Sequence, residues 1–279
     1  MLNIGISSCG FELTKQNFES LKSAGITHIE ISRSWSEYDD MNFEEIKRLA
    51  HKYGITLWSL HLPFANPENV DASSLDEKIR QNTVKWWCSL IEKGAAIGIK
   101  IFVLHPSCGA KSLDHKIRIN HMAASKKSLK ELAEFAEEKG VVIAVENQPR
   151  SSLSRSVEAL AELVSADDRL RVCFDTNHLA GGDNLSLLEK LGDKIITIHV
   201  SDYDFTDEKH WLPGEGKNDW QKIYKTLIQK GYTGPWLYEL NLTPSKAWYV
   251  ERKRPLTFPD FYDNATQIFE NKPFELKDI

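Results

Sequence analysis

Residues 141–148 read VVIAVENQ, five apolar residues followed by a carboxylate and two amides. A parallel strand that is buried on both faces is nearly all apolar, and here the apolar run stops at Glu146. The same pattern returns in residues 171–178, RVCFDTNH, and in residues 195–202, IITIHVSD. Short apolar runs that each end in a polar residue predict parallel strands whose carboxyl ends carry the chemistry.

Eight apolar runs alternate with longer segments whose apolar residues recur at helical spacing, as Phe43, Ile46 and Leu49 do. The runs cover residues 4–8, 28–32, 57–62, 101–105, 142–146, 172–175, 195–199 and 237–240. Six glycines follow the helical segments and predict left-handed helix ends: Gly25, Gly54, Gly98, Gly140, Gly192 and Gly231. The alternation indicates repeated βα units.

The spacing of the strand ends favours one closed barrel. Between Ser8 and Glu239 the seven intervals average 33 residues, which leaves no room for a second domain. Alternation alone is compatible with an open parallel sheet, but eight βα units fit a closed barrel better. We therefore expect an α/β fold, a (β/α)8 TIM barrel formed as a single domain by residues 1–279.

Composition narrows the class of protein. The 279 residues are 41% hydrophobic and 27% charged, with a net charge of −5, which excludes a disordered chain. The charge disfavours nucleic acid and anionic membranes as partners. The longest uncharged stretch, residues 53–67, is too short to span a membrane, and the amino terminus lacks the basic region of a signal peptide. Four widely spaced cysteines are typical of reduced thiols, so we expect a cytoplasmic protein.

Polar side chains end six consecutive strands, from the third to the eighth. They are His61, His105, Glu146, Asp175 with His178, His199 with Asp202, and Glu239. In a barrel these strand ends meet at one mouth. Gathered carboxylates and imidazoles repel or shift one another's pKa values unless a cation holds them. The set therefore predicts a divalent metal ion, and its mixed oxygen and nitrogen donors suit Mn²⁺, Co²⁺, Zn²⁺ or Mg²⁺.

The seventh connection, residues 201–219, is long and acidic and contains His210, Trp211 and a Gly214-Glu215-Gly216 turn. We expect this loop to fold over the mouth and bring His210 toward the substrate. Tryptophans near the strand ends suit a sugar or polyol, because the CH faces of such a ligand are apolar. These tryptophans are Trp35, Trp211, Trp220, Trp236 and Trp248.

The motifs HLPF, LHPS, VENQ, DTNH, HVSD, LPGEG and YELN, in this order at successive strand ends, resemble the xylose-isomerase-like TIM-barrel superfamily. This group contains sugar-phosphate isomerases and epimerases together with endonuclease-IV-like proteins. The resemblance extends over nearly the whole chain, and it implies a (β/α)8 barrel, which agrees with the spacing of the strands. It also allows a homodimer, since many such barrels pair through loops at the mouth.

By this resemblance, one divalent metal ion is held by Glu146, Asp175, His199 and Glu239. Glu146 and Glu239 are in addition the catalytic carboxylates that move the proton of a sugar carbon through a metal-stabilised enediolate. His178 matches a histidine that contacts substrate hydroxyls. The residues assigned to substrate binding are His61, His105, His178, His210, Trp211 and Glu215. The implied activity is that of a sugar, sugar-phosphate or keto-sugar isomerase or epimerase.

Two alternatives remain open. Ketose 3-epimerases of this group usually carry an arginine six residues after the metal histidine, where this chain has Phe205, so an inosose or keto-sugar dehydratase or lyase is the alternative on the same metal site. A trizinc DNA-repair phosphodiesterase of the endonuclease IV type is the alternative from another class. His61, His105, His178 and His210 align with its additional zinc ligands, but Glu208 stands where its aspartate is expected.

Overall fold

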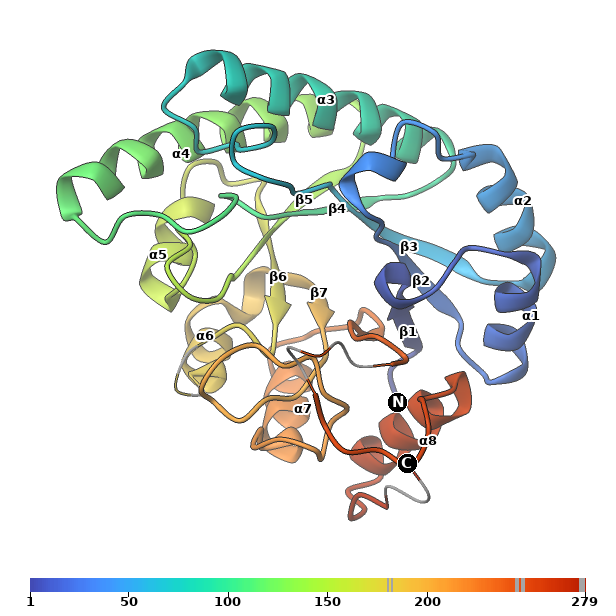
Figure 1. Cartoon of the computed structure of the whole chain (residues 1–279). Coiled ribbons are helices and arrows are strands. Elements are labelled where there is room, and N and C mark those ends of the chain that lie inside the picture. Colours follow the sequence, from blue (N-terminus) through green and yellow to red (C-terminus); the bar gives the residue numbers. More distant parts are fainter. Residues whose placement is uncertain (180, 182, 244–245, 247–248, 276–278) are drawn as a thin grey trace.

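Eight parallel strands surround one axis, and the helices that follow them pack on the outside (Figure 1). The computed structural model of the chain describes every residue except 180, 182, 244–245, 247–248 and 276–278. The strands are β1 (Ile4–Ser7), β2 (His28–Ile31), β3 (Thr56–His61), β4 (Ile101–Leu104), β5 (Val142–Glu146), β6 (Arg171–Asp175), β7 (Ile195–His199) and β8 (Trp236–Tyr238). Each lies within two residues of its expected bounds.

The helices alternate with these strands, apart from short 3-10 turns. The α-helices are α1 (Lys15–Ser23), α2 (Phe43–Tyr53), α3 (Glu77–Ala96), α4 (His115–Glu138), α5 (Val157–Val164), α6 (Asn184–Leu191), α7 (Trp220–Gln229) and α8 (Phe258–Phe269). The 3-10 helices are η1 (Ser8–Gly10), η2 (Trp35–Glu37) and η4 (Gly192–Lys194). None of the helices in the described part of the chain is both long and apolar enough to cross a membrane.

The barrel closes between β7 and β8. The eight strands form one parallel sheet in the order β7-β6-β5-β4-β3-β2-β1-β8, so β7 and β8 are its two edges. At the seam, the backbone N–H of Val200 donates to Leu237 O at 2.8 Å, and the N–H of Glu239 donates to Val200 O at 3.1 Å. Val200, just after β7, thus forms a parallel bridge to Tyr238. The expected (β/α)8 barrel is confirmed, and its closure brings the end of β7 next to the end of β8.

Alternate residues of each strand separate into two cores, because successive side chains point to opposite faces. The large core lies between barrel and helices and includes Ile143, Val145, Val172 and Phe174. A small core inside the barrel contains Ile101, Val103, Ala144 and Cys173. Residues in phase with this inner set continue along the barrel interior to the strand ends, so Glu146 and Asp175 must point inward.

Two register shifts set which residues face inward near the mouth. Between β2 and β3, Ile29 pairs with Leu57 but Glu30 pairs with Ser59, so Trp58 is an extra residue. Between β6 and β7, Val172 pairs with Ile195 but Cys173 pairs with Thr197. A β-bulge of this kind re-aims the side chains that follow it, because the side-chain period of a strand is two. The second shift brings His199 into register with Asp175.

Five of the six glycines expected to end helices have positive φ angles, from 65° to 99°: Gly25, Gly54, Gly98, Gly140 and Gly231. Gly192 is the exception. It has a φ of −57° and continues into η4 instead of reversing the chain. A Cβ atom at Gly192 would lie 2.6 Å from the Lys230 side chain, so this glycine is explained by close packing and not by a left-handed turn.

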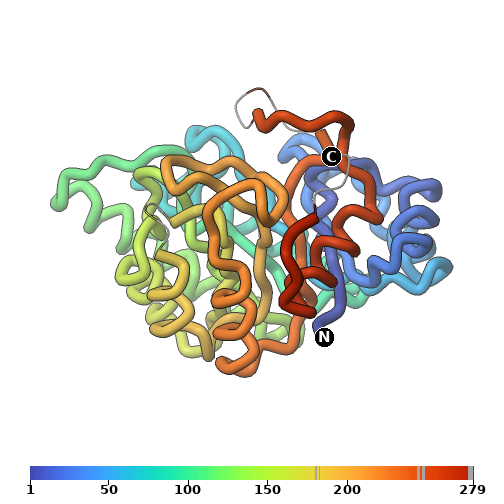
Figure 2. The backbone as a smooth tube through the Cα atoms, turned by 90° about the horizontal axis from the view of Figure 1, so that it is seen from below, coloured from blue at the N-terminus to red at the C-terminus, as the bar shows by residue number. Residues whose placement is uncertain are grey.

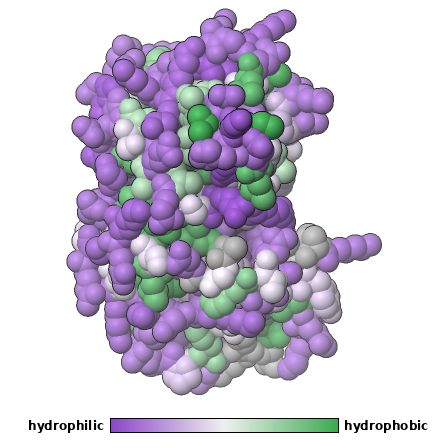
Figure 3. Space-filling view, turned by 90° about the vertical axis from the view of Figure 1, so that its left-hand side faces the viewer, coloured by the Kyte–Doolittle hydropathy of each residue, from purple (hydrophilic) through white to green (hydrophobic). Residues whose placement is uncertain are grey.

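The loops that follow the strands gather on one side of the barrel, opposite the amino terminus (Figure 2). On the flank formed by α4, α5 and α6 the surface is mostly hydrophilic with small apolar areas (Figure 3). All four cysteines are free: Cys108 and Cys173 are buried, Cys88 is half-buried and Cys9 is exposed at the mouth.

Candidate active site

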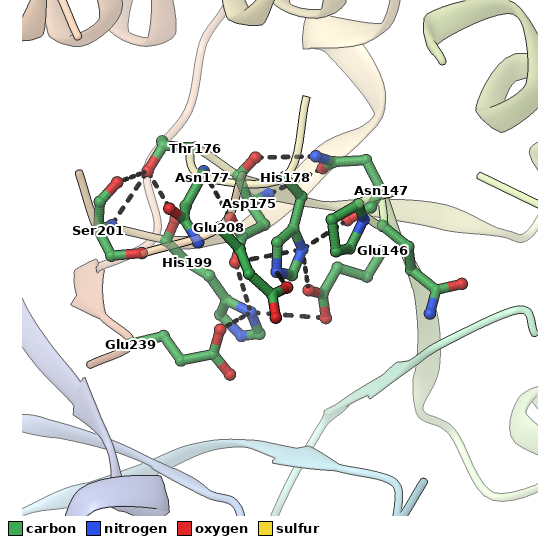
Figure 4. Close-up of polar contacts among 12 residues, drawn as sticks. Glu146, Asn147, Asp175, Thr176, Asn177, His178, His199, Ser201, Glu208 and Glu239 are labelled. Carbon is green, nitrogen blue, oxygen red and sulfur yellow. Dashed lines mark hydrogen bonds and ion pairs between the residues drawn. The ribbon is translucent and has the colours of Figure 1, made fainter. Parts of the chain in front are cut away.

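Four residues from four neighbouring strand ends converge at the mouth: Glu146, Asp175 and His199 end β5, β6 and β7, and Glu239 directly follows β8 (Figure 4). Each offers one ligand atom, and these four atoms lie within 4.8 Å of one another. His199 Nδ1 is 3.2 Å from Glu239 Oε2, 3.5 Å from Glu146 Oε2 and 3.8 Å from Asp175 Oδ2. The structure thus brings together the four residues that the sequence assigned to a metal ion.

The chemistry of these donors fits a divalent cation. Glu146 Oε1, Asp175 Oδ2 and His199 Nδ1 are buried and have no hydrogen-bond partner. Buried polar atoms are nearly always partnered, so three such atoms in one cluster call for a bound group. Three carboxylates and one imidazole make a mixed oxygen and nitrogen set of the kind that binds Mn²⁺, Co²⁺, Zn²⁺ or Mg²⁺.

The charges of the site are unevenly distributed. Burial alone would raise the pKa of Glu146, but His105 and His199 lower it well below its usual value. The pKa of Glu239 is also lowered, because His199 outweighs the cost of burial. Burial raises the pKa of Asp175 well above its usual value, while the carboxylates raise the pKa of His178 to about 10 against the effect of burial. Glu146 and Glu239 are therefore ionised at neutral pH.

Besides the buried set Glu146, Cys173 and His199, which shares two members with the four-residue centre, two further groups of ligand-type residues flank that centre. In the first, His61 Nε2 and His105 Nε2 lie 3.1 Å and 3.4 Å from Glu146 Oε2. In the second, His178, Glu208 and His210 come together, with His178 Nε2 at 3.6 Å from Glu208 Oε2. Glu146 belongs to both the first group and the four-residue centre. The mouth therefore offers three adjoining sets of donors.

The amide of Asn147 fixes the two carboxylates relative to each other. Its Nδ2 donates to Asp175 O and its Oδ1 accepts from Asp175 N, both at 2.8 Å. His178 Nδ1 lies 2.9 Å from Asn147 O and 3.1 Å from Glu146 Oε1. Asn147 thus ties β5 to β6, while the next amide, Gln148, donates to Ser107 O in the segment after β4.

Asn177 connects β6 to the long loop between β7 and α7. Its Oδ1 accepts from the backbone N–H of Lys209 at 2.9 Å and of His210 at 3.4 Å. His210 has a φ of 49°, an uncommon value for a residue other than glycine, and its Nδ1 lies 3.1 Å from Glu239 O. The loop therefore holds the His210 ring beside Glu239, at the mouth of the barrel.

Asp202 organises the rest of this loop. Its carboxylate accepts hydrogen bonds from the backbone N–H groups of Tyr203, Gly214, Gly216 and Asn218 and from the Trp220 indole, at 2.9–3.1 Å. A Cβ atom at Gly216 would lie 2.4 Å from Asp202 Oδ1. The LPGEG sequence is therefore a structured turn around a buried carboxylate.

A cavity of about 560 Å³ opens at the mouth, a size typical of small-molecule sites. Its polar lining includes His105, His178, Glu208, His210 and Glu239. Phe64 contributes an apolar wall, with its ring 4.4 Å from that of His105. Glu146 and His61 lie deeper, with side chains 0% and 1% exposed, behind the residues that line the cavity. The space thus has a polar floor and an apolar side.

Three residues that the sequence assigned to substrate binding, His61, Trp211 and Glu215, are not among the lining residues of this cavity. Glu215 instead accepts two hydrogen bonds from Arg252 at 2.6 Å and 2.7 Å, and both side chains are buried. Trp211 pairs with Asp202 through its backbone and carries the Lys209 ammonium 6.0 Å from its ring centre. The turn that was expected to present Glu215 holds that carboxylate away from the mouth.

The other tryptophans do not wall the cavity either. Trp220 and Trp236 are buried and in ring contact with each other, and Trp35 is exposed on η2; none of the three is a lining residue. Trp248 lies outside the described residues. The aromatic wall is formed by Phe64, whose place directly after the HLP sequence is the signal that could have found it.

Besides Phe64, sequence reasoning missed two charged residues of the site. Glu30, in β2, is fully buried and lies 3.0 Å from His199 Nε2. A carboxylate between Ile29 and Ile31 in an apolar strand was the available signal. Arg150, after β5, lines the cavity and forms ion pairs with Asp207 and Glu208 across the mouth. No short motif marks an arginine in a loop as part of a site.

The model of the xylose isomerase-like TIM barrel family matches residues 18–254. The chain belongs to this family. The resemblance found in the strand-end motifs is therefore confirmed over most of the sequence.

Known proteins of this family resemble the chain along most of its length. A D-psicose 3-epimerase from Ruminiclostridium cellulolyticum is 26% identical over 232 residues, which are 79% of this chain and 75% of that protein. Among solved structures, a D-tagatose 3-epimerase-like protein has a TM-score of 0.80 at 21% identity, covering 97% of this chain and 98% of that one. The IolI protein, solved with a zinc atom, has a TM-score of 0.75 at 19% identity and covers 97% of each chain. The structural likenesses establish the fold.

Proposed function

We propose that this protein is a divalent-metal-dependent isomerase or epimerase that acts on a sugar, a sugar phosphate or a keto-sugar. The observation that carries the proposal is the set Glu146, Asp175, His199 and Glu239, whose ligand atoms lie within 4.8 Å of one another beside a cavity of about 560 Å³; three of these residues have a buried donor atom without a hydrogen-bond partner. These four residues would hold the ion. Bound there, a divalent ion would polarise a sugar carbonyl and the neighbouring hydroxyl. This acidifies the C–H bond of the carbon that carries the hydroxyl.

Glu239 is the carboxylate best placed to take that proton. Its side chain is 12% exposed and lines the cavity, and its lowered pKa keeps it ionised. The C–H bond would break as an oxygen of Glu239 accepts the proton. Return of a proton to the same carbon from the opposite side gives an epimer, whereas return to the neighbouring carbon gives an aldose–ketose isomer.

Glu146 would deliver or accept the proton from the other side. It extends from β5 while Glu239 extends from β8, so the two carboxylates approach the centre from different directions. His178 and His210 line the cavity next to them and would donate hydrogen bonds to substrate hydroxyls. His105 and Phe64 would bound the substrate on its remaining side.

The similarity to a D-psicose 3-epimerase over 232 residues supports a sugar as substrate. The solved IolI structure with a zinc atom, which has the same fold, supports a divalent ion. Phe205 stands where the ketose 3-epimerases of this family usually carry an arginine, so the proposal names no particular ketose.

Incubation in D₂O tests the reaction class. The metal-loaded protein is mixed with a panel of aldoses, ketoses, keto-sugars and inososes, and recovered sugars are analysed by NMR and mass spectrometry. We expect deuterium at one carbon of an isomerised or epimerised sugar. Loss of water or of an aglycone would instead assign a lyase, and no exchange with any member would contradict the proposal.

A second candidate, a phosphodiesterase of the endonuclease IV type, is favoured by one observation. The groups His61–His105–Glu146 and His178–Glu208–His210 adjoin the four-residue centre, so three ions could be held side by side. Among the described residues that line the cavity, however, Arg150 is the one arginine or lysine, and a phosphate backbone is usually bound by several.

Metal content separates the two candidates. Elemental analysis of the protein purified with excess zinc should give about one tightly bound ion per chain for the sugar enzyme. About three ions per chain, together with nicking of abasic DNA, would favour the phosphodiesterase. A chain with no bound ion would contradict both.

A further inference from the structure

A carboxylate lies directly behind the candidate metal ligand His199, inside the barrel. Glu30 is fully buried in β2, and its Oε1 and Oε2 atoms lie 3.0 Å and 3.1 Å from His199 Nε2. The hydroxyl of Ser59 donates to Glu30 Oε2 at 2.8 Å. A buried carboxylate is costly unless it is well partnered. Oε2 of Glu30 has two such partners, and one of them is a ring that belongs to the site, while Oε1 has no hydrogen-bond partner.

Both shifts of register in the sheet place residues that contact Glu30. The extra residue in β3 aligns Ser59 with Glu30, and the extra residue in β7 aligns His199 with Asp175. Without the first shift, Trp58 would stand opposite Glu30 in place of the hydroxyl. Without the second, the side chain of His199 would point away from the barrel interior. The shift in β3 thus places Ser59, and the shift in β7 places His199, the two residues that form hydrogen bonds with Glu30.

The two nitrogens of His199 have different surroundings. Nε2 faces Glu30, an acceptor, and therefore carries a hydrogen. Nδ1 has no hydrogen-bond partner and faces the carboxylates of Glu146, Asp175 and Glu239. An imidazole binds a metal through a nitrogen that carries no hydrogen, and the hydrogen bond of the other nitrogen decides which one that is. The position of Glu30 selects Nδ1.

We propose that Glu30 is a positioning residue of the metal centre, which accepts the Nε2–H of His199 and so holds Nδ1 and the ring plane toward the ion. This inference rests on the proposed metal site. It gives Glu30, a residue within β2, a role in the site at the barrel mouth. A carboxylate behind a metal-bound histidine orients the ring and makes it a better donor, and its loss typically weakens metal binding by about 10- to 100-fold.

Metal affinity of the full chain is the first test. Zn²⁺ and Mn²⁺ dissociation constants are measured by competition with a chromophoric chelator for the wild type and for Glu30→Gln, Glu30→Asp and Ser59→Ala. We expect about 10- to 100-fold weaker binding in Glu30→Gln. Glu30→Asp, which keeps the charge, should recover part of the loss. Ser59→Ala should have a smaller effect, because the contact between Glu30 and His199 remains.

The tautomer of His199 is the second test, and it does not depend on activity. In protein labelled with ¹⁵N-histidine, long-range ¹H–¹⁵N spectra report which ring nitrogen carries the hydrogen, and His199→Gln assigns the signals. We expect Nε2–H in the wild type and a mixed or Nδ1–H state in Glu30→Gln. Glu45→Gln, on the surface of α2, is the matched control and should change neither readout. Circular dichroism confirms folding, and Glu30→Met, similar in volume, replaces Glu30→Gln if the latter does not fold.

The outcomes distinguish this inference from the proposed reaction. Wild-type affinity in Glu30→Gln with unchanged His199 signals would overturn the role of Glu30. A wild-type protein that binds no divalent ion would overturn it as well. A wild-type protein that binds the ion but converts no sugar in the panel contradicts only the proposed reaction, and the metal and tautomer measurements still decide the role of Glu30.

Discussion

His199 Nδ1 lies 3.2 Å from Glu239 Oε2, across the seam where the barrel closes. His199 ends β7, Glu239 follows β8, and the two strands are joined through the backbone of Val200. The contact therefore exists only in the closed barrel, since an open sheet would leave these strands at opposite edges. Because both side chains belong to the candidate metal centre, the site is complete only when the barrel is closed.

Glu239→Gln should abolish most of the turnover. The substitution keeps the shape of the side chain but removes the base, and loss of general base catalysis typically costs about 10²- to 10⁴-fold in kcat. The measurement is the steady-state rate with the sugar identified in the deuterium panel. Metal content is determined in parallel, because Glu239 is also a candidate ligand. A variant that retains metal and wild-type kcat would remove Glu239 from the proposed mechanism.

Glu215→Gln should change stability and leave substrate binding unaffected. The Glu215 and Arg252 side chains are 5% and 3% exposed, and removing one partner of a buried ion pair costs about 3–5 kcal/mol in the free energy of unfolding. Urea denaturation and the KM for the same sugar are the two measurements. A raised KM with unchanged stability would return Glu215 to the substrate site that the sequence suggested.

Gly216→Ala should destabilise the loop between β7 and α7. The added Cβ would lie 2.4 Å from both Asp202 Oδ1 and Tyr203 O, and overpacking of this kind costs about 1–3 kcal/mol. We expect a lower melting temperature and weaker substrate binding, because the same loop carries His210. Lys217→Ala, at an exposed position of the loop, is the control. Equal melting temperatures of the two variants would contradict the argument.

Asp167→Asn should lower stability most at neutral pH and progressively less in acid. Arg169 forms two side-chain hydrogen bonds with Asp167 and lowers its pKa to about 2. Since the folded-state pKa is below the ordinary value, the stabilisation is complete above about pH 4 and is lost as the pH falls through 2. An ion pair near the surface contributes about 0.5–1 kcal/mol.

The measurement is the difference in the free energy of unfolding between wild type and Asp167→Asn at several pH values from 7 to 3. Both proteins share every other carboxyl group, so the difference isolates this one. We expect it to shrink toward the acid end of the range. A difference that stays constant would show that the charge of Asp167 is not what stabilises the turn before β6.

The sequence alone determined the strands and the order of the candidate ligands. Parallel strands buried on both faces must be apolar, so Glu146, Asp175 and His199 stand out as the residues that end such runs. The spacing of eight units then predicted the barrel and, with it, the convergence of these residues at one mouth. These conclusions depend on local pattern, which a single sequence displays.

Only the tertiary structure decided which other residues belong to the site. Glu30 contacts His199 from 169 positions away, and the register shifts in β3 and β7 place the two partners of Glu30, Ser59 and His199, beside it. Glu215 does not lie at the mouth, because its carboxylate pairs with Arg252 from the segment that follows β8. Register shifts and ion pairs between distant segments follow from the packing of the whole chain, so no pattern of neighbouring residues encodes them.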